Sequence, residues 1–238
     1  MDRQAMTAGR KAADRRTRRT SGFTLIEVAL VVVIIGVLTA AAAPSVDRYF
    51  DGINGRAAAR SVANAFSHAR AQAIRTGSNH MVFFAIGGAG DTAGNDLERP
   101  DGGDVPILVL NDGAPGSANQ NCEIDPGEET VTFNEEQGVG FGINGPTILD
   151  RPPEEELVSI PPAGSSLTLP NGAVTTWVLF RPDGIPVAVD AACSQGQLGS
   201  GGGTIYLWTR SRDFAISLSP LGGVRVYTWN LNSQAWTS

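Results

Sequence analysis

Gly22-Phe23-Thr24-Leu25-Ile26-Glu27 opens the apolar run that decides the architecture of this 238-residue chain. The 21 residues at positions 23–43 are apolar with four exceptions, Thr24, Glu27, Gly36 and Thr39. A helix of this length rises roughly 31 Å, which covers a hydrocarbon core of about 30 Å. Residues 23–43 therefore predict one transmembrane helix.

Glu27 places an ionisable side chain inside this apolar segment. A carboxylate at the membrane centre costs about 2.5–3.5 kcal/mol on insertion scales, and less near the interface, so it needs a partner. Cleavage after Gly22 would create that partner, because the new amino group of Phe23 is a cation at nearly the same depth. Glu27 would then neutralise this ammonium group in its own chain or in a neighbouring one.

The residues before the apolar run are strongly basic. Residues 1–22 carry seven Lys or Arg and two Asp, which gives a net charge of +5. The excess of cations predicts that this end of the chain stays in the cytoplasm. The residues after the transmembrane helix are then expected in the periplasm.

Three other interpretations of the N-terminus remain open. A cleaved secretory signal would end its apolar core of about 7–15 residues in small residues, and residues 40–43 supply four alanines, although this core is longer and Pro44 follows it. Arg18-Arg19 suggests a twin-arginine export signal, although Thr20-Ser21-Gly22 replaces the expected hydrophobic residues. A plain single-pass anchor with an incidental Glu27 is the third interpretation.

The stretch at residues 22–27, followed by the apolar helix, resembles the class III signal of type IV pilins and type II secretion pseudopilins. The resemblance implies that a prepilin peptidase cuts between Gly22 and Phe23 and methylates the amino group of Phe23, and that Glu27 aids assembly. It also implies that the helix loosens at Gly36 and Pro44 inside a filament. The implied partners are the peptidase, other pilins or pseudopilins, and the inner-membrane assembly platform.

The helix is expected to continue beyond the membrane as far as residue 76. Apolar residues recur there at steps of three and four, as on one helix face: Val46, Tyr49, Phe50, Ile53, Ala57, Val62, Ala65, Phe66, Ala69 and Ala73. Gly77 is the expected C-cap. Residues 44–77 are therefore predicted to form a periplasmic continuation of the helix that packs on a globular domain.

Residues 78–238 predict a β-rich head. Segments rich in Val, Ile, Phe, Thr and Trp alternate with turn residues, at 80–86, 105–110, 129–133, 139–143, 166–169, 174–180, 185–189, 204–208, 214–219 and 224–229. Pro186 is expected to place its strand at a sheet edge. The predicted class is α+β and pilin-like, with a long N-terminal helix packed on an antiparallel β-sheet domain. The long loops between strands are the expected surface for partners.

Three segments narrow the resemblance to the GspH/FimT group of minor pseudopilins and minor pilins. They are the helix end at residues 69–75 with the strand that follows it, residues 179–184 with the turn Pro182-Asp183-Gly184, and residues 217–226 with the turn Ser219-Pro220-Leu221-Gly222. This resemblance implies a minor subunit that primes or caps a type II secretion pseudopilus or a type IV pilus.

The charge of the mature chain disfavours a large nucleic-acid footprint. Without the seven cations and two acids of residues 1–22, the totals of 18 Lys plus Arg and 24 Asp plus Glu leave a net charge of −11. Some FimT-like pilins bind DNA through arginines, and the last 35 residues hold Arg210, Arg212 and Arg225 among aromatic residues. A DNA-binding minor pilin is therefore kept as an alternative, beside packing of these aromatics in a β core.

Cys122 and Cys193 are the only cysteines, 71 positions apart. In an oxidising periplasm they could form a disulfide between two loops, and two free thiols are the alternative. Oxygen-bearing side chains in one glycine-rich loop are weak Ca²⁺ candidates, without EF-hand spacing: Asp91, Asn95, Asp96, Asp101 and Asp104. No nucleophile elbow, phosphate loop or zinc signature is present in the sequence, so we expect neither an enzyme nor a cofactor.

Overall fold

The computed structural model describes residues 22–98, 104–134, 137–144, 152, 164–230 and 233–238. It confirms the α+β class, with a long N-terminal helix and antiparallel β-sheets. The chain divides into two units, Met1–Pro44 and Ser45–Ser238. The second unit holds all the described strands and the C-terminal part of the helix.

Helix α1 spans Leu25–Thr76, close to the predicted range of 23–76. Its N-terminus is capped by Thr24, whose Oγ1 accepts a hydrogen bond of 3.3 Å from the backbone N–H of Glu27. At the other end Gly77 has a φ of +67°, a conformation that favours glycine, and its N–H donates to the carbonyl of Ala73 at 3.0 Å. Both ends of the helix are therefore fixed by local sequence.

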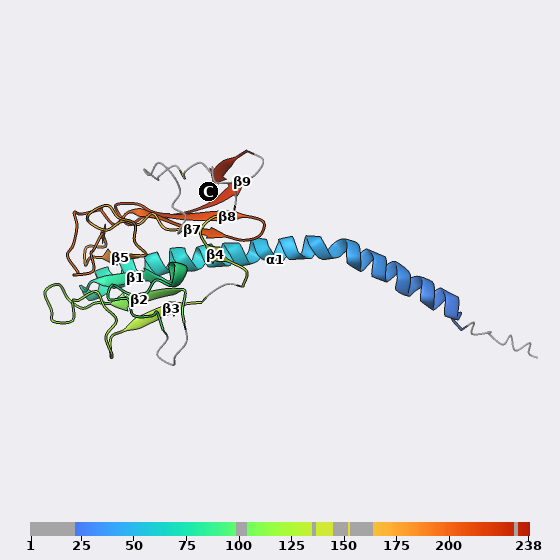
Figure 1. The fold of residues 1–238 in the computed structure, drawn as a ribbon, viewed down its shortest axis with the longest axis horizontal. Helices are drawn as coiled ribbons and strands as arrows, with labels where there is room; N and C mark the ends of the chain where they lie inside the picture. Colours follow the sequence, from blue (N-terminus) through green and yellow to red (C-terminus); the bar gives the residue numbers. More distant parts are fainter. Residues whose placement is uncertain (1–21, 99–103, 135–136, 145–151, 153–163, 231–232) are drawn as a thin grey trace, which may run out of the picture. The chain divides into compact units, whose positions relative to one another are not determined.

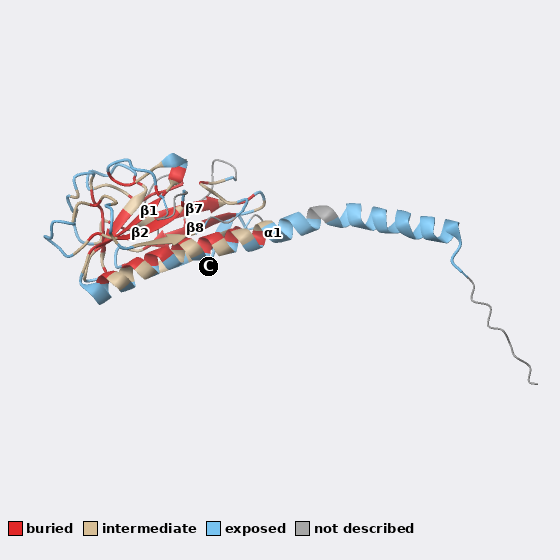
Figure 2. Cartoon of the chain, turned by 90° about the horizontal axis from the view of Figure 1, so that it is seen from below, coloured by how far each residue is buried: buried red, intermediate tan, exposed pale blue. Residues whose placement is uncertain are grey.

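The C-terminal half of α1 is amphipathic in the structure. Small and aromatic side chains on one face are buried, among them Ala59, Val62, Phe66 and Ala69, whereas Arg60 is exposed. The predicted apolar face begins earlier than the buried one: Val46, Tyr49, Phe50 and Ile53 are 42–67% exposed. Figure 2 shows the change from exposed to buried residues along this helix. The head therefore covers only the later part of the predicted stripe.

The described strands form two antiparallel five-stranded sheets within the predicted β-rich head. The first sheet has the order β3-β2-β1-β5-β6, with bounds Thr130–Phe133, Ile107–Asn111, His80–Phe84, Trp177–Phe180 and Pro186–Val187. The second has the order β10-β9-β8-β7-β4, with bounds Ala235–Thr237, Val224–Asn230, Asp213–Leu218, Gly203–Trp208 and Gly140–Phe141. A short 3-10 helix, η1, spans Ile86–Gly88. In Figure 1 the C-terminal part of α1 runs along both sheets.

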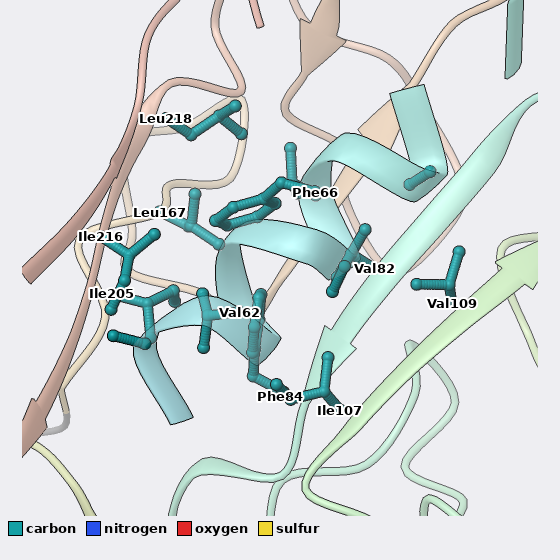
Figure 3. Close-up of a cluster of buried hydrophobic side chains, with 14 of the residues drawn as sticks. Val62, Phe66, Val82, Phe84, Ile107, Val109, Leu167, Ile205, Ile216 and Leu218 are labelled. Carbon is teal, nitrogen blue, oxygen red and sulfur yellow. The ribbon is translucent and has the colours of Figure 1, made fainter. Parts of the chain in front are cut away.

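The main core lies where α1 meets both sheets. Val62 and Phe66 from the helix share a cluster with Val82 of β1 and with Ile205 and Ile216 of the second sheet. Figure 3 shows side chains of this cluster that come from the helix, from the first sheet and from the second sheet. The Phe66 ring lies edge-on to Phe84, with centroids 5.4 Å apart. The helix thus joins two sheets that are not hydrogen-bonded to each other along any described strand.

The outer face of the first sheet is covered by long loops. Met81, Phe83 and Leu179 point into a second buried cluster that also contains Leu97 and Cys122 from the loops. These loops were expected to be the surface for partners, and that role stays a prediction. Part of their own apolar side chains is buried, because alternate residues of β1 face opposite sides of the sheet and both sides need cover.

Two details differ from the predicted strands, and one is confirmed. Residues 166–169 form no described strand and hold one isolated bridge, Thr168 with Val174. Strand β10 was not predicted, and it pairs Trp236 with Trp229 of β9. The prediction for Pro186 is confirmed, since β6 is an edge strand of the first sheet.

Candidate functional site

The predicted processing segment lies at the start of helix α1. Gly22 and Phe23 are exposed and precede the first helical residue, and the Phe23 side chain is 82% exposed. The bond from the Glu27 backbone N–H to the Thr24 hydroxyl is one of the two hydrogen bonds of a capping box. The T-x-x-E spacing signals this motif, which was not predicted from the sequence. The Glu27 side chain itself is exposed. It is therefore available to a partner outside its own helix.

The apolar part of α1 has no protein cover. Among the described residues, this is the one helix long and apolar enough to cross a membrane, and none of its apolar window is buried. The helix is continuous through Gly36 and Pro44. The loosening of the helix at these two positions concerns the assembled filament and stays a prediction.

Asp91, one of the Ca²⁺ candidates, is buried and fully engaged in hydrogen bonds. Its Oδ1 accepts from the backbone N–H groups of Ala93 and Asn95 at 3.0 and 2.8 Å. Its Oδ2 accepts from Asn95 Nδ2 and from the N–H of Ile124, both at 2.9 Å. Three of these bonds close the turn at residues 91–95, and the bond from Ile124 fastens the loop before β2 to the loop after it, so the Asp91 carboxylate acts as a structural clamp.

The other Asp candidates for Ca²⁺ are not gathered into a ligand group within the described residues. Asp96 and Asp104 are exposed and line a cavity of about 380 Å³ together with Leu97 and Phe141, and Asp101 lies outside the described residues. Within the described part of the chain, one group of three ligand-type side chains lies within 4.8 Å, and it contains none of these candidates. That group is Asp112, Cys122 and Cys193.

Cys122 and Cys193 form a disulfide, with their Cα atoms 5.4 Å apart. The bond ties the loop after β2 to the turn that follows β6, on the covered face of the first sheet. Asp112 stands beside it, fully buried, and its Oδ1 accepts from the backbone N–H of Cys122 at 2.7 Å. Burial is the main cause that raises the pKa of the Asp112 carboxyl to about 6, against the lowering effect of its backbone hydrogen bonds. Sequence reasoning missed Asp112, because nothing in the local pattern marks an Asp after a strand as buried.

The three segments that narrowed the family resemblance meet in space. Arg70 of α1 is half-buried and donates from Nη1 to the carbonyl of Gly222 at 2.9 Å. The turn that contains Gly222 touches the turn that contains Gly184, since a Cβ built on Gly222 would lie 2.8 Å from the Gly184 carbonyl oxygen. One helical arginine thus connects a turn of each sheet.

The aromatic residues of the C-terminal region pack against one another. Tyr206, Tyr227, Trp229 and Trp236 form a buried cluster on the second sheet, with the Trp229 and Trp236 ring centroids 5.3 Å apart. The residues Arg210, Arg212 and Arg225 are exposed. The aromatic rings are therefore not presented beside the arginines as a platform on which bases could stack.

Comparison with known proteins identifies the N-terminal segment. Residues 17–43 match the prokaryotic N-terminal methylation motif. No curated protein and no solved structure matches the chain. The motif supports a type IV pilin-like class III signal, and with the uncovered apolar helix it supports a processed, membrane-anchored subunit of the pilin type.

Proposed function

We propose that this chain is a minor pilin or pseudopilin of the GspH/FimT type. Prepilin peptidase would cut between Gly22 and Phe23 and methylate the Phe23 amino group. The subunit would then wait in the inner membrane as a single-pass protein, with the leader side cytoplasmic and the head periplasmic. The match of residues 17–43 to the methylation motif is the observation that supports processing and anchoring. The GspH/FimT part of the proposal rests on the resemblance of residues 69–75, 179–184 and 217–226.

The physical driving force is the pairing of Glu27 with a new cation. After cleavage, the Phe23 ammonium and the exposed Glu27 carboxylate carry opposite charges near one end of the apolar segment. At about 4 Å such a pair is worth roughly 4 kcal/mol at an effective dielectric of about 20. Glu27 of an arriving subunit would therefore favour a place beside the Phe23 ammonium of a subunit already in the filament.

The exposed apolar side chains of α1 supply a second contribution. Tyr49 and Phe50 lie beyond the apolar run, and their exposed fractions are 67% and 55%. Like the apolar segment before them in the chain, they have little protein cover. Neighbouring helices in a filament would bury these side chains, as the assembly platform draws the subunit from the membrane.

The head would decide which neighbours fit. Arg70 and the two turns that it joins are the segments on which the resemblance to minor subunits rests. A minor subunit with such a head would prime or cap a type II secretion pseudopilus or a type IV pilus. Its partners would be other pilins or pseudopilins and the inner-membrane assembly platform.

The test separates processing from assembly. The variant Glu27→Gln removes the charge and keeps the size of the side chain, and Asp47→Asn removes an exposed carboxylate further along the same helix. We expect both variants to yield a mature chain that begins at methylated Phe23, measured by mass spectrometry of the intact protein. We expect only Glu27→Gln to lose incorporation into sheared filaments.

Two results would contradict the proposal. A mature chain that retains residue 1, or one cut near Ala42, would replace the pilin reading with a plain anchor or a secretory signal. Normal incorporation of Glu27→Gln into filaments would contradict the proposed pairing of Glu27 with the Phe23 ammonium. It would leave the proposed cleavage and methylation unaffected.

A further inference from the structure

Asp112 lies in contact with both sulfur atoms of the disulfide. Its Oδ1 is held by the backbone N–H groups of Asn121 and Cys122, at 3.2 and 2.7 Å. Its Oδ2 lies 3.7 Å from Cys122 Sγ and 3.9 Å from Cys193 Sγ. The carboxylate is therefore fixed by one oxygen and presents the other to the two sulfurs.

In the oxidised protein this second oxygen has nothing to bind. A disulfide sulfur carries no proton, so neither contact is a hydrogen bond, and no N–H or O–H donor reaches Oδ2 among the described residues. Leaving a buried acceptor unsatisfied is costly. A thiol at either cysteine would supply the missing donor, since S–H is a weak donor. The position of Asp112 Oδ2 is thus complementary to the dithiol form of Cys122 and Cys193.

The charges around Asp112 favour proton uptake. No ion pair joins it to a cation in the described part of the chain, and the charged groups that act on it are Glu128 and Asp125, both carboxylates of the same loop. Burial and these like charges raise the pKa of Asp112 to about 6. The carboxyl group can consequently accept and return a proton near neutral pH.

We propose that Asp112 is the proton acceptor for closure of the Cys122–Cys193 disulfide. The oxidant is a disulfide-bearing molecule of the form RSSR. The Cys193 thiolate, having given its proton to solvent, attacks RSSR, which forms a bond between Cys193 Sγ and RS and releases RS⁻ to take a proton from solvent. Cys122 then transfers its thiol proton to Asp112 Oδ2 and attacks Cys193 Sγ. The bond to RS breaks, and the second RS⁻ takes the proton from Asp112, so that two thiols and RSSR become one disulfide and two RSH.

The order of attack follows from exposure. Cys193 is half-buried in a turn, where Asp190 Oδ1 accepts from the N–H groups of Ala192 and Ser194 at 3.0 and 2.9 Å. Cys122 is completely buried. An external disulfide therefore reaches Cys193 first, and Cys122, the sulfur without access to solvent, is the one that needs an internal base.

The test measures the second step in the full chain, purified in detergent. The reduced protein is mixed with oxidised glutathione, quenched with acid at intervals, and analysed by mass spectrometry for the mixed and internal disulfides. Asp112→Asn keeps an oxygen for the two backbone N–H groups but removes the base. The matched control is Asp213→Asn, which alters a buried carboxylate of the second sheet, away from the disulfide.

We expect Asp112→Asn to slow resolution of the mixed disulfide by about a hundredfold at pH 7, and Asp213→Asn to follow the native chain. Equal rates in Asp112→Asn and the native chain would overturn the proposal. The native chain alone gives a second test, which holds even where the variant does not fold. Its resolution rate should rise with pH and level off well below the ordinary thiol pKa of about 8.5, because the buried carboxylate, not solvent, takes the Cys122 proton. A continuous rise toward the ordinary thiol pKa of about 8.5, without a break, would overturn the proposal as well.

Discussion

Gly55 of helix α1 lies directly against the ring of Phe214 in β8. A Cβ built on Gly55 would lie 2.8 Å from Phe214 Cζ and 2.9 Å from Thr209 Cγ2. The helix therefore approaches the second sheet more closely than any residue with a side chain would allow. Glycine has a low helix propensity. At position 55 its missing side chain allows the contact between the helix and the second sheet.

The variant Gly55→Ala is expected to destabilise the head. The gain in helix propensity of about 1 kcal/mol is smaller than the cost of forcing a methyl group against Phe214, about 1–3 kcal/mol. Chemical denaturation of the full chain in detergent, followed by tryptophan fluorescence, measures the net loss.

Gly52 supplies the matched control one helical turn earlier. A Cβ built there would meet no atom within 4 Å. Gly52→Ala should therefore stabilise the protein by up to about 1 kcal/mol through helix propensity alone. An equal effect of both substitutions would show that the contact with Phe214 does not limit this position.

Loss of the disulfide is expected to lower the free energy of unfolding by about 4 kcal/mol. The bond closes a segment of 71 residues, and on the loop-entropy model the unfolded chain gains this freedom when the bond is absent. The double variant Cys122→Ser with Cys193→Ser should show the loss in the same denaturation experiment. Reduction of the native chain should reproduce most of it, and an unchanged midpoint in either sample would contradict the prediction.

Asp112 should make stability depend on pH while the disulfide is intact. Folding raises its pKa from 3.8 to about 6, so the folded state binds the proton more tightly than the unfolded state. Its contribution is therefore fully present below pH 3.8 and is lost as pH rises to about 6, by about 3 kcal/mol in total. Asp112→Asn should remove this decline from the pH profile of the unfolding free energy. A profile identical to that of the native chain would exclude Asp112 as its source.

Helix α1 could be predicted from the sequence because its signals are local. The apolar run, the basic residues before it and Gly77 each act within a few residues, and α1 has nearly the predicted bounds. The strands on either side of the turn at Gly222, β8 and β9, are also within one residue of the predicted ranges, because turn residues frame them. Strand β10 was missed because its three residues depend on pairing with β9 and carry no pattern of their own.

The candidate site was harder to predict, because it depends on contacts between distant segments. Asp91 and Asp112 look like ordinary loop acids, and only the folding of the loops over the first sheet buries both of them. The division into two sheets likewise depends on pairing between strands that are distant in the sequence, such as β1 with β5. In the same way, Tyr49 and Phe50 fit the helical period, but the period does not say where the head ends.

Arg70 is expected to hold the two turns in place through its bond to the Gly222 carbonyl. Arg70→Met keeps the length of the apolar stem and removes the donor, and hydrogen bonds from charged groups contribute about 1.5–3 kcal/mol. The exposed Arg60, on the same helix, is the matched control, and Arg60→Met should change stability by less than about 0.5 kcal/mol.

Amide hydrogen exchange distinguishes a local effect of Arg70→Met from general destabilisation. The N–H groups of Gly184 and Gly222 donate within their own turns, to Arg181 and Ser219, both at 2.8 Å. If Arg70 fastens both turns, these two amides should lose protection in Arg70→Met well beyond the amides at the centre of β8. A uniform loss of protection across the head would instead mean that Arg70 contributes to global stability without fixing the turns.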